Sequence, residues 1–172
     1  MRRDKAWIEV DGQPMVARAL ATVRKLGVRE VFVSGRAQGD YSKLECPVLL
    51  DREPGFGPLA GIERALEACS SPLLLVLAVD LPRMTAEFLG RLVEACEPAR
   101  GIVPRLDGQL EPLAAIYPKR SHAVILDLIR ESRHAACEFA EICLQRELTR
   151  IHPVEPKDAG CFVNWNNPSD IS

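Results

Sequence analysis

The sequence lacks any long hydrophobic run and any strong excess of charge of one sign. Its longest strongly apolar run, Leu73–Val79, has seven residues, and a transmembrane helix needs ~20. Arg2, Arg3 and Asp4 are not followed by a long apolar segment, as they would be in a secretory signal peptide. The net charge of −2 and the pI near 6.0 argue against a general nucleic-acid-binding surface. We therefore expect a soluble, cytoplasmic domain that binds neither membranes nor nucleic acid.

Paired cysteines and clustered histidines are also missing. The six cysteines are widely spread and none forms a Cys-x-x-Cys pair, whereas disulfide frameworks occur mainly in shorter secreted chains. The three histidines lack the spacing of zinc ligands relative to one another. We expect free thiols that are buried or half-buried, and no zinc site.

The chain does contain regularly alternating strand and helix patterns. Its 172 residues, 47% of them hydrophobic, suffice for one large core, and no repeat or linker divides residues 1–172, so we expect a single domain. Leu73–Val79 has the pattern of a strand covered on both faces in a parallel sheet. The alternation predicts a three-layer α/β/α architecture with a mostly parallel, doubly wound, Rossmann-like sheet.

Local signals place the individual elements. Pro14 and Gly27 bound a predicted helix, Thr85 is suited to cap another, and Asp107-Gly108 is a strong signal for a hairpin turn. Further elements are expected from their apolar patterns: strands at 30–33, 48–50 and 149–154, and helices near 121–131 and 135–146.

Two aspartates, Asp51 and Asp80, each end an apolar strand pattern. Ligands of doubly wound sheets bind beyond the carboxyl ends of the strands, and Mg²⁺ prefers oxygen ligands that it shares with phosphates. Asp80 could instead serve as a helix cap, but Thr85 already supplies that cap. The position therefore favours a metal-binding role for Asp80.

Other polar or glycine-rich segments allow two interpretations each. GFGPLAG at 55–61 is suited to approach an anion at a helix N-terminus, but an ordinary loop explains it equally well. Lys5, near Arg2 and Arg3, is suited to bind phosphate, although a basic run at a chain end is usually solvated. Asn164 and Asn166 would share a face of an extended segment or form a turn, and Glu111 alone reads as surface.

Taken in order, these segments resemble the molybdenum cofactor guanylyltransferase family, within the sugar-nucleotide-like nucleotidyltransferases. The resemblance runs the length of the chain. GPLAG and the terminal Asn pair are specific in combination, whereas the Asp-x-Pro signature is shared by many nucleotidyltransferases. The family resemblance is found in five segments, which are MRRDKAWIEVDGQP, LLDREPGFGPLAGI, VLAVDLP, GQLEPLAAIY and FVNWNNPSDI.

The resemblance implies a nucleotidyltransferase sheet and guanylyl transfer from GTP to molybdopterin, with release of pyrophosphate and formation of a guanine dinucleotide cofactor. Lys5 and Asp80 would be catalytic, and Asp80 would bind Mg²⁺. Glu111, Asn164 and Asn166 would face the acceptor. It also implies transient contact with molybdenum insertion proteins or recipient molybdoenzymes. The nucleotide would contact Lys5, Asp51, Gly57, Pro58, Leu59, Ala60, Gly61 and Asp80.

The sequence departs from the family at both ends. The family's first strand and Leu-Ala-Gly-Gly loop have no counterpart, so we expect a chain that is truncated relative to the family and catalytically poor until extended upstream. The terminal Asn-Thr-Pro is replaced by Asn166-Asn167-Pro168. Two alternatives stay open: a relative that uses CTP or another phosphorylated acceptor, and a truncated, non-catalytic protein that binds the cofactor or a partner.

Overall fold

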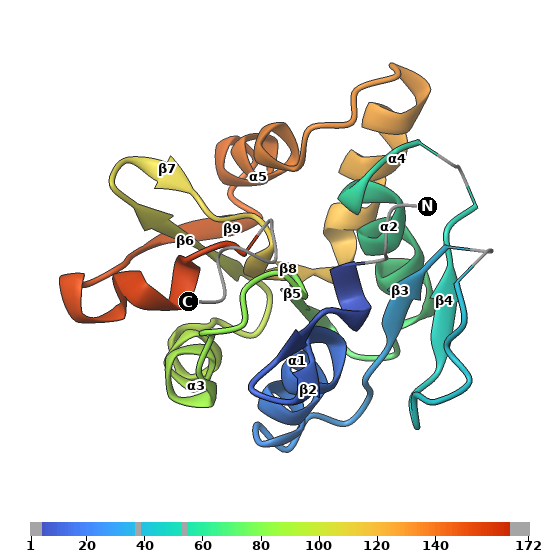
Figure 1. Ribbon diagram of the computed structural model, residues 1–172. Coiled ribbons are helices and arrows are strands. Elements are labelled where there is room, and N and C mark those ends of the chain that lie inside the picture. The colour runs from blue at the N-terminus through green and yellow to red at the C-terminus, as the bar shows by residue number, and fades with distance from the viewer. Residues whose placement is uncertain (1–4, 37–38, 53–54, 166–172) are drawn as a thin grey trace.

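The computed structural model describes residues 5–36, 39–52 and 55–165. Within these ranges the chain forms five α-helices and three short 3₁₀ helices, with β3 and β4 at one edge of the molecule (Figure 1). The helices are η1 (Lys5–Trp7), α1 (Met15–Arg24), α2 (Pro58–Ala68), α3 (Ala86–Ala95), η2 (Lys119–Ser121), α4 (His122–Arg130), α5 (Ala136–Gln145) and η3 (Pro156–Phe162). The strands are β1 (Glu9–Val10), β2 (Gln13–Pro14), β3 (Val33–Gly35), β4 (Val48–Leu50), β5 (Leu73–Leu77), β6 (Gly101–Leu106), β7 (Gln109–Leu110), β8 (Ala114–Pro118) and β9 (Thr149–Pro153).

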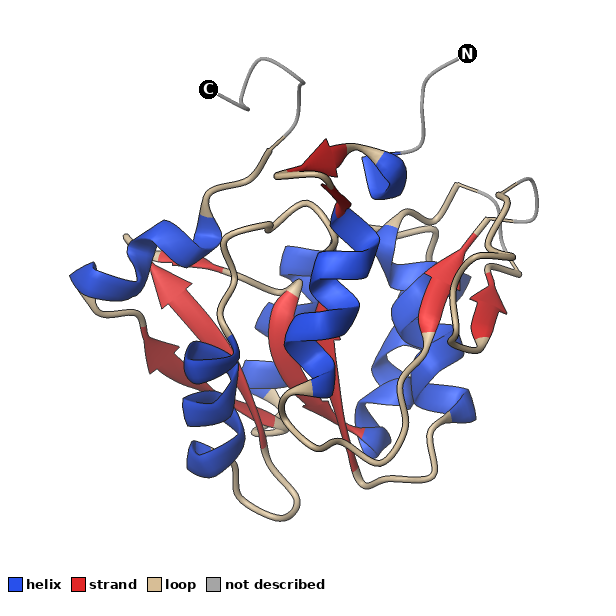
Figure 2. Ribbon diagram, turned by 60° about the horizontal axis from the view of Figure 1, so that its bottom comes forward, coloured by secondary structure: helices blue, strands red, loops and turns tan. Residues whose placement is uncertain are grey.

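Two hydrophobic cores lie on opposite faces of the β5–β9 sheet. Ala115 and Tyr117 of β8 join a cluster with α2, α4 and α5, whereas Ala114 and Ile116 join a second cluster with α3 and η3. Successive side chains of a strand point to opposite faces, so one strand serves both cores. With α1 and α3 turned forward, Figure 2 shows the strands lying behind these helices. The three-layer α/β/α expectation is confirmed.

The large sheet follows the order β5-β8-β6-β7, with β9 paired to β6. β8 runs antiparallel to both β5 and β6, and β9 runs parallel to β6. β5, β6 and β9 therefore share one direction, and β8 is reversed between two of them. Of the predicted run, β5 covers Leu73–Leu77, whose side chains pack against both cores. Its direct neighbour is antiparallel, because burial of a strand does not specify its partner's direction.

β3 and β4 form a separate parallel pair, in which Ser34 lies opposite Leu49. The strand expected at 30–33 is shifted to Val33–Gly35, because hydrogen bonding to the β4 segment begins at Val33, whose N–H donates to the Pro47 carbonyl at 3.0 Å. α2 starts after β4, ends before β5 and packs against β3, β4 and β5. The helix thus connects the two sheets along the chain.

The predicted turns and caps are present. Asp107 and Gly108 have φ of 48° and 83° between β6 and β7, the left-handed conformations of a two-residue hairpin. The Thr85 hydroxyl accepts a hydrogen bond from the Phe88 N–H at 3.1 Å and caps α3. All six cysteines are free. None of the helices in the described ranges is long and apolar enough to cross a membrane.

Candidate active site

Asp51 lies directly after β4, where it contacts both β3 and α2. Its N–H donates to the Gly35 carbonyl at 3.1 Å, and the Ser34 hydroxyl donates to its Oδ1 at 3.1 Å. Asp51 is half-buried and Ser34 is exposed. The carboxylate is therefore held at the carboxyl ends of two neighbouring strands with one oxygen oriented by a hydroxyl.

The glycine at position 61 lets α2 approach this carboxylate closely. A Cβ built on Gly61 would lie 2.2 Å from the Ser34 Oγ and 2.7 Å from the Ser34 Cβ, with the Asp51 Oδ1 at 3.8 Å. Contacts below 3 Å to the Cβ of a neighbouring residue cannot be relieved by rotating its side chain. The buried Gly61 therefore packs directly against Ser34, whose hydroxyl bonds to Asp51, and this packing is possible because glycine has no Cβ.

The start of α2 is the exposed part of the GPLAG segment. Gly57, at the N-cap position, has φ of 56° and open space around its α-carbon, and both Gly57 and Pro58 are exposed. Leu59 and Ala60 are instead buried in the core side of the helix. No described side chain caps the first turn, so its amide groups are suited to bind an anion.

Three separate segments meet at Asp80. The Ala78 N–H donates to the Leu113 carbonyl at 2.7 Å, and the Trp165 N–H donates to the Asp80 carbonyl at 3.0 Å. The Arg83 guanidinium lies over the Trp165 ring, 5.6 Å from its centroid. The end of β5, the connection before β8 and the 164–165 segment are thereby held together around a half-buried aspartate.

Glu111 and Asn164 are close in sequence to residues of these contacts: Glu111 lies two residues before Leu113, and Asn164 immediately precedes Trp165. The Glu111 N–H donates to the Pro104 carbonyl at 2.9 Å, and burial raises the pKa of the Glu111 carboxyl above its ordinary value. Asn164, next to Trp165, is exposed. Asn166 and the side chain of Lys5, the first residue of η1, lie outside the described residues.

The donor set at Asp80 fits a metal ion that is shared with phosphates. Within the described residues, no three His, Cys, Asp or Glu side chains are grouped to hold a metal by themselves. Mg²⁺ in nucleotide sites is commonly bound by one or two carboxylates while substrate phosphates and water fill the other positions. The carboxylate of Asp80 belongs to this chemical class of ligand.

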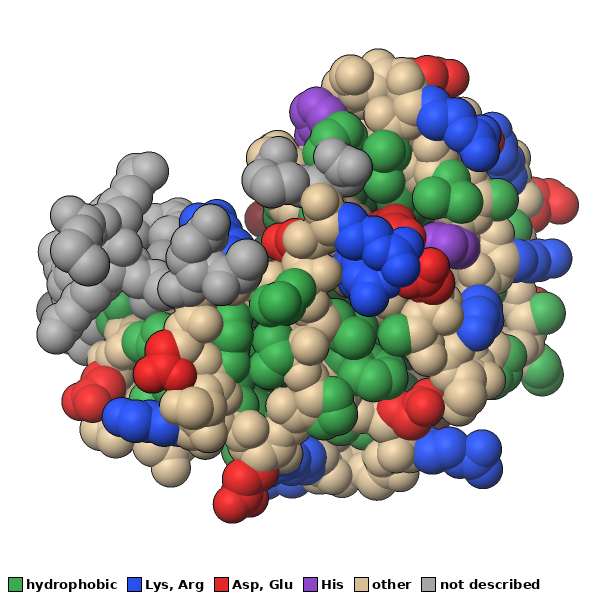
Figure 3. Space-filling model, turned by 90° about the vertical axis from the view of Figure 1, so that its right-hand side faces the viewer, with side chains coloured by type: hydrophobic (Ala, Val, Ile, Leu, Met, Phe, Trp, Pro, Cys, Tyr) green, Lys and Arg blue, Asp and Glu red, His purple; other side chains and the backbone are tan. Residues whose placement is uncertain are grey.

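Sequence reasoning missed Ser34 and Arg52. Ser34 is expected from the sequence in the turn that closes a strand, and only the parallel pairing of β3 with β4 brings it to Asp51. Arg52 forms ion pairs with Glu67 at 2.9 Å and Glu63 at 4.0 Å, on a face where basic, acidic and histidine side chains gather (Figure 3). The spacing Arg52–Glu67 spans 15 residues and carries no local sequence signal.

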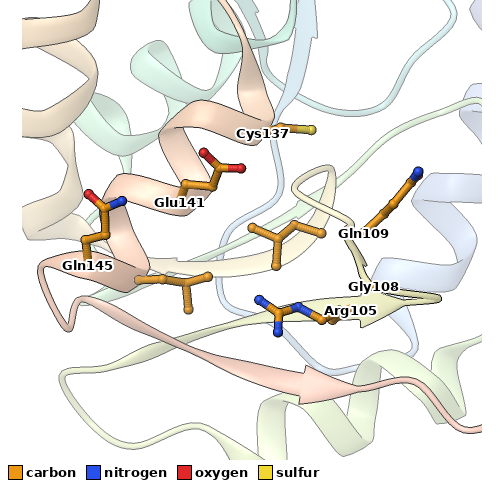
Figure 4. A pocket seen from close by; sticks show the side chains of 8 residues that line it. Arg105, Gly108, Gln109, Cys137, Glu141 and Gln145 are labelled. Carbon is orange, nitrogen blue, oxygen red and sulfur yellow. The ribbon is translucent and has the colours of Figure 1, made fainter.

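A cavity of about 480 Å³ lies between the β6–β7 hairpin and α5 (Figure 4). Arg105 reaches it from β6, and Cys137, Glu141 and Gln145 reach it from α5. Among the described residues, none of those expected from the sequence to bind nucleotide, metal or acceptor lines this cavity. It is therefore a different place from the strand ends at Asp51 and Asp80.

Comparison with solved structures identifies the same fold elsewhere. Molybdopterin-guanine dinucleotide biosynthesis protein A from Archaeoglobus fulgidus superposes with a TM-score of 0.75 at 24% identity, over 97% of this chain and 86% of that one. The 2-C-methyl-D-erythritol 4-phosphate cytidylyltransferase from Thermus thermophilus gives a TM-score of 0.74 at 20% identity, over 97% and 90%. Both likenesses show a Rossmann-like nucleotidyltransferase fold.

Sequence comparison gives the family. A probable molybdenum cofactor guanylyltransferase from Opitutus terrae is 31% identical over 173 residues, which cover 99% of this chain and 86% of that protein. The molybdenum cofactor guanylyltransferase of Pseudomonas aeruginosa is 38% identical over 119 residues, covering 67% and 60%. The family model for the MobA-like NTP transferase domain matches residues 1–147. The chain belongs to the MobA-like NTP transferase family.

Proposed function

We propose that the chain transfers the guanylyl group of GTP to molybdopterin-type molybdenum cofactor, forming the guanine dinucleotide cofactor and releasing pyrophosphate. The names of its relatives support the substrates. In this chain, the main structural support for the proposal is that the end of β5, the connection before β8 and residues 164–165 meet near Asp80. That convergence provides a place where a nucleotide phosphate and an acceptor phosphate can meet.

The nucleotide side of this proposed site consists of Asp51 and the start of α2. Gly57 and Pro58 offer an exposed, uncapped helix N-terminus for the phosphates, where aligned peptide dipoles favour negative charge. Asp51 is oriented by Ser34 to accept hydrogen bonds from the nucleoside. Leu59, Ala60 and Gly61 contribute through backbone and packing, and Lys5 is proposed to contact the phosphates.

The metal side consists of Asp80, which is proposed to hold Mg²⁺ together with the phosphates of the bound nucleotide. When bound, Mg²⁺ would neutralise charge on the phosphates of the substrate. A terminal phosphate oxygen of the acceptor forms a bond to the α-phosphorus of GTP, and the bond from that phosphorus to the β-phosphate bridging oxygen breaks. Pyrophosphate departs with the electron pair of that bond. The residues of the chain bind and align the two phosphates for this displacement.

The acceptor side consists of Glu111, Asn164 and Asn166. Burial raises the pKa of Glu111 above its ordinary value, and its carboxyl is proposed to hydrogen-bond to a polar group of the acceptor substrate. Asn164 offers an amide next to the segment that is bonded to Asp80. The product would then pass to molybdenum insertion proteins or recipient molybdoenzymes.

The test measures pyrophosphate release and dinucleotide formation by the purified chain with Mg²⁺, molybdopterin and either GTP or CTP. We expect turnover with GTP, and loss of it in Asp80→Ala with little change in the thermal midpoint. Asp127→Ala is the matched control, because Asp127 is a carboxylate on α4 whose ion-pair partners are the exposed Arg130, at 2.9 Å, and the exposed Arg146, at 3.9 Å.

The outcomes separate the alternatives. Faster turnover with CTP would identify a cytidylyl-transferring relative, and unchanged turnover in Asp80→Ala would remove the proposed metal role. Binding of molybdopterin without turnover of either nucleotide would identify a non-catalytic cofactor-binding protein.

A further inference from the structure

The connection between β4 and α2 carries the nucleotide side of the proposed site. We use "β4–α2 connection" for its described residues, which are Asp51, Arg52, Gly55, Phe56 and Gly57. Gly55 and Gly57 have φ of 105° and 56°, conformations that residues with a Cβ rarely adopt. Backbone preference therefore does little to fix this connection, and side-chain contacts must set its position.

At its first end the connection is held by ion pairs. Arg52 bonds to Glu67 of α2 through two nitrogen–oxygen contacts of 3.0 and 2.9 Å. It also lies 4.0 Å from Glu63, a carboxylate that is only 5% exposed. Glu63 in turn contacts the His122 Nε2 at 3.0 Å, and His122 is the first residue of α4. The start of the connection is thus joined to the start of α4.

At its second end the connection is held by an aromatic contact. The Phe56 ring packs edge to face against the His134 ring, with centroids 4.0 Å apart and an interplanar angle of 90°. Phe56 immediately precedes Gly57, the N-cap residue of α2. His134 lies between α4 and α5, so this contact joins the end of the connection to the segment after α4.

The segment that presents His134 is itself well fixed. The Arg133 N–H donates to the Leu128 carbonyl at 2.9 Å, and the Arg133 guanidinium bonds to Glu131 at 2.6 Å and to Glu138 of α5 at 2.9 Å. These bonds tie the residue next to His134 to both helices. His134 therefore offers a defined surface for Phe56 to pack against.

We propose that Phe56 and His134 are positioning residues that hold the N-terminus of α2 in the place where it binds the nucleotide phosphates. The proposal rests on the proposed function. Neither ring contributes a charge or hydrogen bond to the substrate; the pair acts by fixing the backbone of Gly57. Loss of the contact should weaken binding of the nucleotide in the ground state and transition state alike, which raises KM and leaves kcat unchanged.

The experiment compares His134→Ala with His134→Phe in the full chain. GTP affinity is measured by calorimetry without the acceptor, and kcat and KM are measured with it. We expect His134→Ala to weaken GTP binding and raise its KM by about 2- to 10-fold, the range that loss of one aromatic pair implies. His134→Phe keeps a ring and should restore both values.

Hydrogen exchange provides a readout that does not depend on substrate. The amides of Gly55 to Gly57 should exchange faster in His134→Ala than in the unmodified chain and in His134→Phe. His152→Ala is the matched control, because His152 also packs edge to face against a phenylalanine, Phe88, at 6.0 Å, but lies on β9. It should change neither GTP affinity nor exchange in the connection.

Each outcome supports or overturns the proposal. Unchanged GTP affinity in His134→Ala, with GTP bound normally by the unmodified chain, would overturn the positioning role and leave the proposed function intact. A fall in kcat at constant KM would overturn it in the same way. Failure of the unmodified chain to bind GTP or CTP would overturn the proposed function and the positioning role with it.

Discussion

At the scale of single residues, α2 can pack closely against β3 because residue 61 is a glycine and has no Cβ. A Cβ at position 61 would lie 2.7 Å from the Ser34 Cβ. We predict that Gly61→Ala destabilises the fold by about 1–3 kcal/mol, the usual cost of overpacking. It should also weaken GTP binding, because Ser34 bonds to Asp51. Urea unfolding and calorimetry measure the two effects.

Gly90 provides the matched control for this substitution. It lies in α3, and a Cβ there would meet Leu26 at 3.9 Å, an ordinary contact distance. Gly90→Ala should be neutral or stabilise the fold by up to about 1 kcal/mol, as alanine favours a helix interior. Equal destabilisation by both substitutions would contradict the packing argument.

The buried carboxyl of Glu111 predicts a particular pH dependence of stability. Burial raises its pKa in the folded chain above its ordinary value, so the folded state holds the proton more tightly than the unfolded state. The favourable contribution of the protonated Glu111 carboxyl to the free energy of unfolding is fully present below the pKa of the unfolded state. It is lost as pH rises through the pKa of the folded state. Glu111→Gln should therefore raise the free energy of unfolding at pH 7 relative to the unmodified chain.

The measurement is a series of urea unfolding curves from about pH 4 to about pH 8 for both proteins, a range that starts near the ordinary glutamate pKa and extends above it. The difference in the free energy of unfolding between Glu111→Gln and the unmodified chain should shrink toward the acid end of the series, because protonation of the glutamate there removes the buried charge. A difference that does not vary with pH would show that burial of this carboxylate is not the cause.

A residue could be predicted from the sequence when its signal was local, and could not when it depended on a partner far away along the chain. The positions of Asp51 and Asp80 after strands could be predicted because each follows an apolar run in the sequence. His134 could not, because its partner Phe56 lies far earlier in the chain, and two isolated aromatic residues give no periodic signal.

At the scale of elements, α3 depends on its first turn. The Thr85 hydroxyl caps the Phe88 N–H at 3.1 Å, and Phe88 is fully buried in the core beneath the helix. We predict that Thr85→Ala lowers the free energy of unfolding by about 1 kcal/mol. Thr85→Ser keeps the hydroxyl and should recover most of the loss. A similar loss in both variants would assign the effect to the methyl group.

Elements defined by local pattern were predictable, and those defined by partners were less so. Helices at 121–131 and 135–146 were close to the observed α4 and α5, and Asp107-Gly108 correctly marked the β6–β7 turn. The reversed direction of β8 between β5 and β6 was not predictable. Apolar alternation reports which faces are buried, whereas direction depends on which strand lies alongside.

At the scale of the whole molecule, the two cores share the same strands. Ile102 and Val103 are successive residues of β6, yet one belongs to the core with α3 and the other to the core with α2, α4 and α5. Loss of packing on one face therefore disturbs strands that the other face needs. We predict one cooperative unfolding transition for both cores.

The test substitutes one buried ring in each core, as Phe88→Leu and Phe139→Leu. Each should lower the midpoint, and tryptophan fluorescence and far-ultraviolet circular dichroism should report the same midpoint in each variant. The double variant should destabilise by about the sum of the two, within roughly 0.5 kcal/mol. Separate transitions for the two probes would show that the faces unfold independently.

The reversed strand β8 also affects how the family can diversify. Because β8 runs opposite to β5, the chain enters it beside the place where it leaves β5, as the Ala78–Leu113 hydrogen bond shows. In the proposed site, the acceptor side would thus include Glu111, just after the β6–β7 hairpin, and the nucleotide side would include the β4–α2 connection. The acceptor-side segment and the nucleotide-side segment can therefore accumulate substitutions independently of each other. Exchanging the segment from Asp107 to Leu113 between relatives should therefore transfer preference for the acceptor while leaving the choice of nucleotide where it was.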